Sequence, residues 1–228
     1  MRGFLAPVFK VTLLLLLSVP MIQADTISGT GSGGAIPDYS GGTPGLFTSD
    51  IVISDSRLIL SSGNNVTVEL VSLAHTWLGD LQVTLERVGS GGEISLFNRV
   101  GRVGGSGFGD SSDLGGTYKF NNSFTGDLWA TAAGTSGTIP SGEYFPTSAG
   151  SSAETSFSDV WNGLAAADTW RLRIRDHAGA DVGSLDSWKL SIEVADVEPI
   201  PEPMSMLLLS TGLAGIAALR RKKFLTKR

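Results

Sequence analysis

Hydrophobic and polar residues alternate strictly in four separate segments of this 228-residue chain, 66–70, 81–86, 170–175 and 188–194. In the first segment Val66, Val68 and Leu70 alternate with threonine and glutamate, and the other three keep the same period of two. This period turns one row of side chains toward a core and the other toward water. Each segment is therefore predicted to be a β-strand with one buried face.

The segments between these strands favour turns. Glycine-rich stretches at 89–92 and 101–109 separate shorter strand candidates, and no stretch between the chain ends keeps a helical period. Scattered aromatic residues of the Gly/Ser/Thr-rich region 101–156 are expected to fill the core from long loops: Phe108, Tyr118, Phe120, Phe124, Trp129, Tyr144 and Phe145. The pattern predicts an all-β fold, an antiparallel, jelly-roll-like β-sandwich.

The first 24 residues have the features of a secretory signal peptide. Arg2 and Lys10 supply positive charge, Val11–Ile22 is a short apolar run, and Ala24 is a suitable last residue before cleavage. An uncleaved membrane helix is the alternative, although the run is short for one. We expect cleavage after Ala24 and export of the remainder.

A second apolar run, Met204–Leu219, lies near the other end of the chain. Its 16 residues would form a helix of about 24 Å, somewhat less than a hydrocarbon core of ~30 Å. The basic tail 220–228 would stay on the cytoplasmic side, which leaves the chain before Pro201 outside the membrane. We expect a hydrophobic helix at 204–219 that holds the protein in the membrane at least transiently.

Pro201, Glu202 and Pro203 immediately precede this run. The tripeptide, the apolar run and the basic tail together resemble the PEP-CTERM sorting signal of Gram-negative bacteria. In that family a membrane-embedded exosortase recognises the tripeptide, and the tail is thought to be removed. The resemblance implies exosortase and signal peptidase as processing partners, and a final location in the cell envelope, at the outer surface or in the extracellular matrix. An ordinary membrane anchor would share the apolar run and basic flank, but not the tripeptide.

The mature chain is strongly acidic. Residues 1–24 and 204–228 hold eight of the 17 basic residues and none of the 22 acidic ones, which leaves nine against 22 and a net charge near −13. Such a surface repels nucleic acid, so no nucleic-acid partner is expected, and it offers oxygen ligands to calcium. The absence of cysteine excludes disulfides, thiolate nucleophiles and zinc sites built on sulfur.

The organisation of the chain follows from these segments. Residues 25–35 are rich in Gly and Ser and are expected to form a flexible leader, and the folded domain is expected at 36–195, followed by the sorting segment 196–228. Gly29–Gly34 matches G-x-G-x-x-G, but it lacks the preceding strand and following helix that dinucleotide binding needs. We interpret that match as coincidence.

Three motifs in order resemble the P domain (P/Homo B domain), the β-sandwich that follows the catalytic domain in furin/kexin-like and many bacterial subtilisin-like proteases. They are His75–Leu81 (H-T-W-x-G-D-L), Trp170–Asp176 (W-x-L-x-I-x-D) and Asp181–Trp188 (D-x-G-x-L-x-x-W), with Ile36-Pro37-Asp38 at the start. The resemblance covers Ile36 to about Val194 and departs from the family in the centre of the chain. It implies a module that stabilises or regulates a separate subtilisin-like protease.

The motifs also suggest a metal site and roles for large residues. Asp80 and Asp176 are each expected at a strand end, and with Asp181 they make three candidate ligands for a calcium ion. The alternative is that these aspartates accept hydrogen bonds in turns. Apart from calcium, no cofactor is expected. Gly79 is expected to permit a tight turn, and the indole N–H groups of Trp77 and Trp188 are expected to need hydrogen-bond partners.

The candidates for catalysis are few. His75, inside the motif, is expected to be a hydrogen-bonded structural residue, and His177 to be exposed in a polar turn. Gly134-Thr135-Ser136 resembles a subtilisin serine motif, but no helix follows it and the aspartate and histidine motifs are missing. The sequence therefore supplies no catalytic residues.

Three classes of function remain. The favoured one is a non-catalytic binding or structural module of the envelope or the exopolysaccharide matrix. Trp129 or Trp161, where exposed, would stack on sugars, and packing in the core is the alternative and more frequent place for tryptophan. The second is an accessory domain that acts in trans on a subtilisin-like serine endopeptidase. The third, direct proteolysis, would require a catalytic role for Ser136 or His75.

Overall fold

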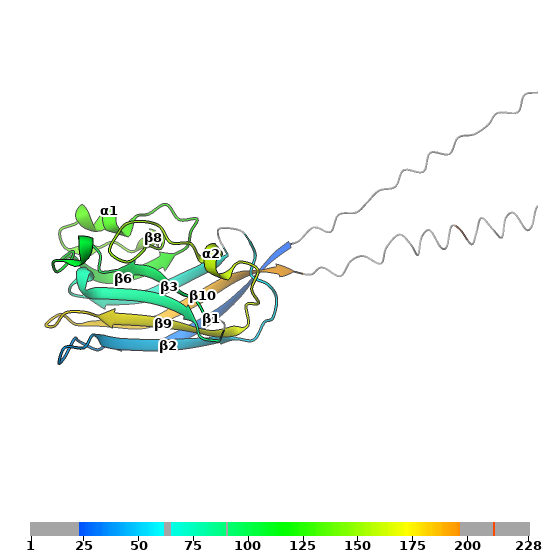
Figure 1. The fold of residues 1–228 in the computed structure, drawn as a ribbon, viewed down its shortest axis with the longest axis horizontal. Helices are drawn as coiled ribbons and strands as arrows, with labels where there is room; N and C mark the ends of the chain where they lie inside the picture. Colours follow the sequence, from blue (N-terminus) through cyan, green and yellow to red (C-terminus); the bar gives the residue numbers. More distant parts are fainter. Residues whose placement is uncertain (1–22, 62–64, 90, 197–211, 213–228) are drawn as a thin grey trace, which may run out of the picture. The chain divides into compact units, whose positions relative to one another are not determined.

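The computed structural model describes residues 23–61, 65–89, 91–196 and 212, and within it Ala24–Asp196 form one compact unit (Figure 1). The predicted apolar run of the signal peptide and the Pro-Glu-Pro tripeptide lie outside the described residues. So do the predicted membrane helix, apart from Gly212, and the basic tail. In the described part of the chain no helix is both long and apolar enough to cross a membrane.

All four strands predicted from alternation are present. They are β3 (Val66–His75), β4 (Leu81–Arg87), β9 (Asp168–Asp176) and β10 (Gly183–Asp196). In β9 buried and partly exposed residues alternate from Trp170 to Asp176, as a strand with one face on the core requires.

Two sheets stack as a sandwich, which confirms the predicted fold class. The larger sheet has the strand order β1 (Gln23–Ile36), β10, β3, β6 (Asp113–Phe120) and β7 (Thr138–Ile139), and β8 (Gly142–Tyr144) also pairs with β6. The smaller sheet has the order β2 (Gly45–Ile53), β9, β4 and β5 (Glu93–Asn98). The pairs β10–β3, β3–β6, β2–β9, β4–β9 and β4–β5 are antiparallel, whereas the short β7 and β8 pair parallel with β6.

The core between the sheets is built around tryptophan. Trp161, Trp170 and Trp188 are fully buried, and the rings of Trp161 and Trp170 meet edge to face with centroids 4.9 Å apart. Such edge-to-face pairs favour the aromatic quadrupoles and add to the free energy gained by burying the rings.

The glycine-rich leader predicted at 25–35 is wrong, because these residues lie in β1 at the edge of the larger sheet. The glycines let this strand pass close to other groups. A Cβ atom at Gly31 would lie 2.0 Å from the indole nitrogen of Trp188, and one at Gly33 would lie 2.0 Å from the carbonyl oxygen of Leu185. The folded unit consequently begins at Ala24, twelve residues before the predicted boundary at Ile36.

The central region contains elements that the alternation did not predict. Two helices, α1 (Leu128–Ala133) and α2 (Phe157–Trp161), are too short to show a helical period. Two 3₁₀ turns, η1 (Leu78–Asp80) and η2 (Val103–Gly105), occupy loops.

The expectation that the aromatic residues of 101–156 fill the core is confirmed for Tyr118, Phe120 and Tyr144, which are buried. It is wrong for Phe108, which is 75% exposed.

Candidate functional site

The three sequence motifs meet at one end of the sandwich through His75, Asp176 and Gly183. His75 ends β3 opposite Gly183 of β10, and Leu81 begins β4 opposite Asp176 of β9. A Cβ atom at Gly183 would lie 2.5 Å from Cδ2 of His75, so the glycine of the third motif leaves room for the histidine of the first. We call His75, Asp80, Arg99 and Asp176 the buried charged cluster.

The imidazole of His75 is enclosed by protein groups. The side chain is fully buried, and its Nε2 lies 3.3 Å from Oδ2 of Asp176. Its Nδ1 lies 3.1 Å from the backbone nitrogen of Trp77 and 2.9 Å from the carbonyl oxygen of Trp77. Both ring nitrogens therefore face fixed partners, and the expected hydrogen bonding of His75 is confirmed.

The two carboxylates of the cluster are buried close to each other. Burial raises the pKa of Asp80 to about 6, and the negative charge of Asp176 acts in the same direction, whereas Arg99 opposes it. Nη2 of Arg99 lies 3.7 Å from Oδ1 of Asp80, too far for a hydrogen bond. Burial also raises the pKa of Asp176, against the hydrogen bond that the N–H of Ala178 donates to it. These shifts reflect the cost of placing two negative charges in an enclosed site.

The third calcium candidate, Asp181, has a partner of its own. Its Oδ1 accepts a hydrogen bond of 2.8 Å from the hydroxyl of Thr76, which in turn accepts one from the N–H of Val182. Within the described residues no three His, Cys, Asp or Glu side chains gather in a group that could hold a metal ion. The hydrogen bonds favour the turn role for Asp176 and Asp181, whereas Oδ1 of the buried Asp80 accepts none from the described residues. Calcium binding by Asp80, Asp176 and Asp181 stays a prediction.

His177 is partly buried, so the expectation of a simply exposed side chain is wrong. Its Nε2 lies 2.9 Å from Oε1 of Gln82, and its backbone N–H donates to the carbonyl of Asp80 at 2.9 Å. Burial lowers the pKa of this histidine, and the positive charge of Arg99 contributes in the same direction. His177 therefore ties the end of β9 to the start of β4.

The other motif residues also have defined contacts, some of them farther along the strands. A Cβ atom at Gly79 would lie 2.5 Å from the carbonyl oxygen of Phe108, so glycine is needed for close approach of the loop. The indole N–H of Trp77 donates to the same carbonyl at 3.1 Å, and that of Trp188 donates to the hydroxyl of Ser49 at 2.9 Å. The expected partners of both indole groups are thus confirmed.

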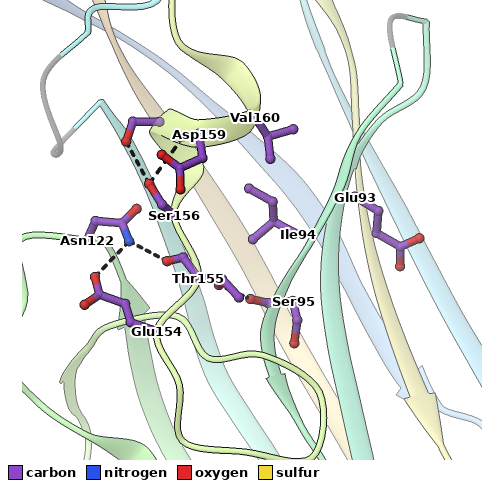
Figure 2. Close-up of a pocket in the computed structure, with 10 residues that line it drawn as sticks. Glu93, Ile94, Ser95, Asn122, Glu154, Thr155, Ser156, Asp159 and Val160 are labelled. Carbon is purple, nitrogen blue, oxygen red and sulfur yellow. Dashed lines mark hydrogen bonds between the residues drawn. The ribbon is translucent and has the colours of Figure 1, made fainter.

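A hollow lies away from this cluster, between the start of β5 and the segment that leads into α2 (Figure 2). It has a volume of about 660 Å³. We call it the polar groove, and its lining residues are Glu93, Ile94, Ser95, Asn122, Glu154, Thr155, Ser156, Ser158, Asp159 and Val160. The lining combines hydroxyl, amide and carboxylate groups with two aliphatic side chains and carries no lysine or arginine.

Hydrogen bonds between separate segments hold the wall of the groove. The amide of Asn122 donates to Glu154 and to the carbonyl of Thr155, and its oxygen accepts from the N–H of Phe157 at 2.9 Å. The hydroxyl of Thr155 donates to the carbonyl of Ser95 at 3.1 Å, which joins this segment to β5. The sequence pattern does not predict this groove, because its residues come from three distant segments that share no motif.

The two tryptophans proposed to stack on sugars are not exposed. Trp161, the last residue of α2, is fully buried and stacks on Phe157 with ring centroids 5.6 Å apart. Trp129 is partly buried against the core, and its N–H lies 3.3 Å from the hydroxyl of Thr147. The prediction is therefore wrong for Trp161, and Trp129 presents only part of its ring.

Ser136 does not join these residues in a catalytic arrangement in the described structure. It is exposed in the turn before β7, and a strand rather than a helix follows it. His75, by contrast, is buried with both ring nitrogens engaged.

The C-terminal segment matches a known family model. Residues 199–222 are a PEP-CTERM protein-sorting motif. The resemblance inferred from Pro201, Glu202 and Pro203 is thereby confirmed, and this motif marks the chain for export and for exosortase sorting at the envelope of a Gram-negative bacterium.

No curated protein matches the sequence. Among solved structures, the chain is similar to the serine protease of Aeromonas sobria, with 20% identity over 76% of this chain and 26% of that one and a TM-score of 0.35. The complex of that protease with its chaperone matches with 19% identity over 77% and 27% and a TM-score of 0.34. A third structure, PfGH50B, matches with 13% identity over 76% and 23% and a TM-score of 0.28. The chain spans about a quarter of the length of these structures.

Proposed function

We propose that the mature protein is a non-catalytic β-sandwich that serves as a binding or structural module of the cell envelope or of the exopolysaccharide matrix. The observation that carries this proposal is the PEP-CTERM motif at 199–222, which follows a compact, acidic sandwich. The sorting motif directs the chain to the envelope, and the sandwich is the part that would act there.

The polar groove supports a binding role. Its hydroxyl, amide and carboxylate groups are the donors and acceptors that sugar hydroxyls require, and the aliphatic side chains of Ile94 and Val160 offer apolar contact to a sugar ring. The fixed wall at Asn122 would let a ligand bind without ordering the loop first.

We further propose that the sandwich is of the P/Homo B type. In support, the three motifs lie far apart in the sequence and still converge on one end of the fold, with His75 beside Asp176 and packed on Gly183. This arrangement gives the motif residues a shared physical role in closing the end of the sandwich.

Mass spectrometry and fractionation of the native protein test the envelope function. We expect an N-terminus at Asp25, a C-terminus close to Pro203, and recovery of the mature form with envelope or matrix polysaccharide. A variant with Glu202→Ala is the matched control and should retain the tail. An intact C-terminus at Arg228 in the native protein, or mature protein found free of both fractions, would contradict the proposal.

The accessory role is the second candidate, and the convergence of the P-domain motifs is the observation that favours it. In this role the sandwich would dock on a separately encoded subtilisin-like enzyme that lacks such a domain. Co-purification with that enzyme, and loss of its stability on deletion of this gene, would support the second candidate over the first.

Direct proteolysis has the least support, because His75 is buried between Trp77 and Asp176. Casein cleavage by the purified mature protein that disappears on Ser136→Ala would revive it.

A further inference from the structure

A second hollow, with a volume of about 350 Å³, lies where β5 turns into the loop that carries η2. Its lining residues are Asn98, Arg99, Arg102, Gly104, Gly105, Ala149 and Gly150. We call it the arginine pocket. It holds two cations and no carboxylate, although the mature chain has nine basic against 22 acidic residues.

A tight turn brings the two arginines together. The N–H of Arg102 donates to the carbonyl of Arg99 at 2.9 Å, and Gly101 between them has φ +80°. This φ at the third position of a four-residue turn favours glycine. Arg99 itself has φ +47°, a backbone conformation that is uncommon for a residue with a side chain and that concentrates at functional sites.

The two guanidinium groups differ in how many of their N–H donors have a partner in the protein. Arg99 donates through Nε to the carbonyl of Gly79 at 3.0 Å and lies near Asp80. Arg102 donates to the carbonyl of Gly105, pairs with no carboxylate among the described residues, and keeps a buried Nε without a partner. Burial lowers the pKa of Arg99, and repulsion from the positive charge of Arg102 acts in the same direction. An anion in the pocket would relieve this repulsion and satisfy the fork of Arg102.

The shape of the pocket favours an anion carried on a sugar ring. The remaining walls are small, with Gly104, Gly105, Ala149 and Gly150, and a volume of about 350 Å³ exceeds what a simple inorganic anion fills. Phe108, on the same loop but outside the residues that line the pocket, is 75% exposed.

We infer that the arginine pocket binds the carboxylate of a uronic acid residue in an acidic polysaccharide, with Arg102 as the main contact and Arg99 as its neighbour. The choice of a matrix polymer as the source rests on the proposed function. An acidic segment of a partner protein would present the same carboxylate, and it is the competing outcome of the test.

Calorimetry with the full-length protein at low ionic strength tests this inference, with a galacturonate trimer and its methyl ester as probes. The trimer is expected to bind and the uncharged ester is not, and added salt should weaken binding because the contact is ionic. Arg102→Gln should weaken binding about tenfold or more, the effect of losing one charged hydrogen-bonded contact.

Two variants keep the result interpretable. Ala149→Leu leaves both arginines in place but fills the pocket, so it should also weaken binding. Lys189→Gln removes one positive charge from an exposed lysine of β10 and should leave the affinity unchanged. Unfolding midpoints near that of the wild type confirm that each variant is folded.

Several results would overturn the inference: equal binding of trimer and ester, full affinity in Arg102→Gln, or tighter binding of an oligoaspartate than of the trimer. If the trimer fails to bind while the native protein still fractionates with the matrix, the pocket inference fails and the proposed function stands. Loss of matrix fractionation alone would count against the proposed function instead.

Discussion

Nε2 of His75 lies 3.3 Å from Oδ2 of Asp176, although 101 positions separate the two residues in the chain. Both side chains are completely buried. The pair joins the end of β3 in one sheet to the end of β9 in the other, so it fastens the two layers of the sandwich at the end where the motifs meet.

His75→Ala should lower the free energy of unfolding by about 3–5 kcal/mol, because it leaves a buried carboxylate without its partner and opens a cavity. Chemical denaturation followed by tryptophan fluorescence measures this loss. His177→Ala is the matched control: that side chain is only partly buried and outside the pair, so about 1 kcal/mol is expected. Equal losses of unfolding free energy in the two variants would contradict a structural role for the His75–Asp176 pair.

The raised pKa of Asp80, about 6 against an ordinary 3.8, predicts how stability changes with pH. Well below pH 3.8 the group is protonated in both the folded and the unfolded chain. As the pH rises toward 6, the unfolded chain releases this proton first, so the contribution of Asp80 to stability falls and then levels off. Asp80→Asn should remove this change and stabilise the protein at pH 8 by about 1–3 kcal/mol.

The measurement is the difference between wild type and Asp80→Asn in denaturant midpoints from pH 4 to pH 8. Carboxylates in surface ion pairs, such as Asp50 beside Arg171, have a lowered pKa and change stability with pH in the opposite direction. Because both proteins contain them, the difference removes their contribution. A difference that does not change with pH would contradict the assignment.

Gly31→Ala should destabilise the protein by about 1–3 kcal/mol or more, because the new methyl group would collide with the Trp188 indole. Gly134→Ala is the control, since a Cβ atom there would lie 3.6 Å from its nearest neighbour, and it should change stability far less. Thermal unfolding of both variants checks the prediction. If Gly31→Ala melts like the wild type, β1 does not pack across Trp188 in solution.

Calcium binding by Asp80, Asp176 and Asp181 predicts that added calcium raises the melting temperature of EGTA-treated protein and that Asp181→Asn abolishes the rise. Binding would require Asp181 to leave its hydrogen bond with Thr76. Magnesium serves as the control cation. A melting temperature that calcium leaves unchanged would assign these aspartates to the turns alone.

Local patterns were sufficient where the cause is local. The alternation in 170–175 and 188–194 predicted β9 and β10, since a half-buried strand imposes its period directly on the sequence. The leader at 25–35 shows the limit of composition. Gly and Ser usually indicate a flexible segment. Here, however, positions 31 and 33 require glycine because they face Trp188 and Leu185, which lie more than 150 positions away. No local pattern records such a contact.

The candidate sites divide in the same way. Order and spacing of residues identified the sorting motif at 199–222 and the motif residues around His75, because these features are contiguous in the chain. The polar groove, and the Nε of Arg102 that has no partner among the described residues, depend on how loops from separate segments pack. Burial cannot be read from residue type, because Trp161 is buried while Phe108 is exposed.

The sequence alone thus determined the destination of this protein, its acidic character and its β-sandwich class, since each follows from contiguous segments or from the period of a strand. Only the tertiary structure decided that β1 belongs to the sheet, that His75 and Asp176 form a buried pair, and where the two hollows lie. These features arise from contacts between residues far apart in the chain, and such contacts exist only once the two sheets have packed.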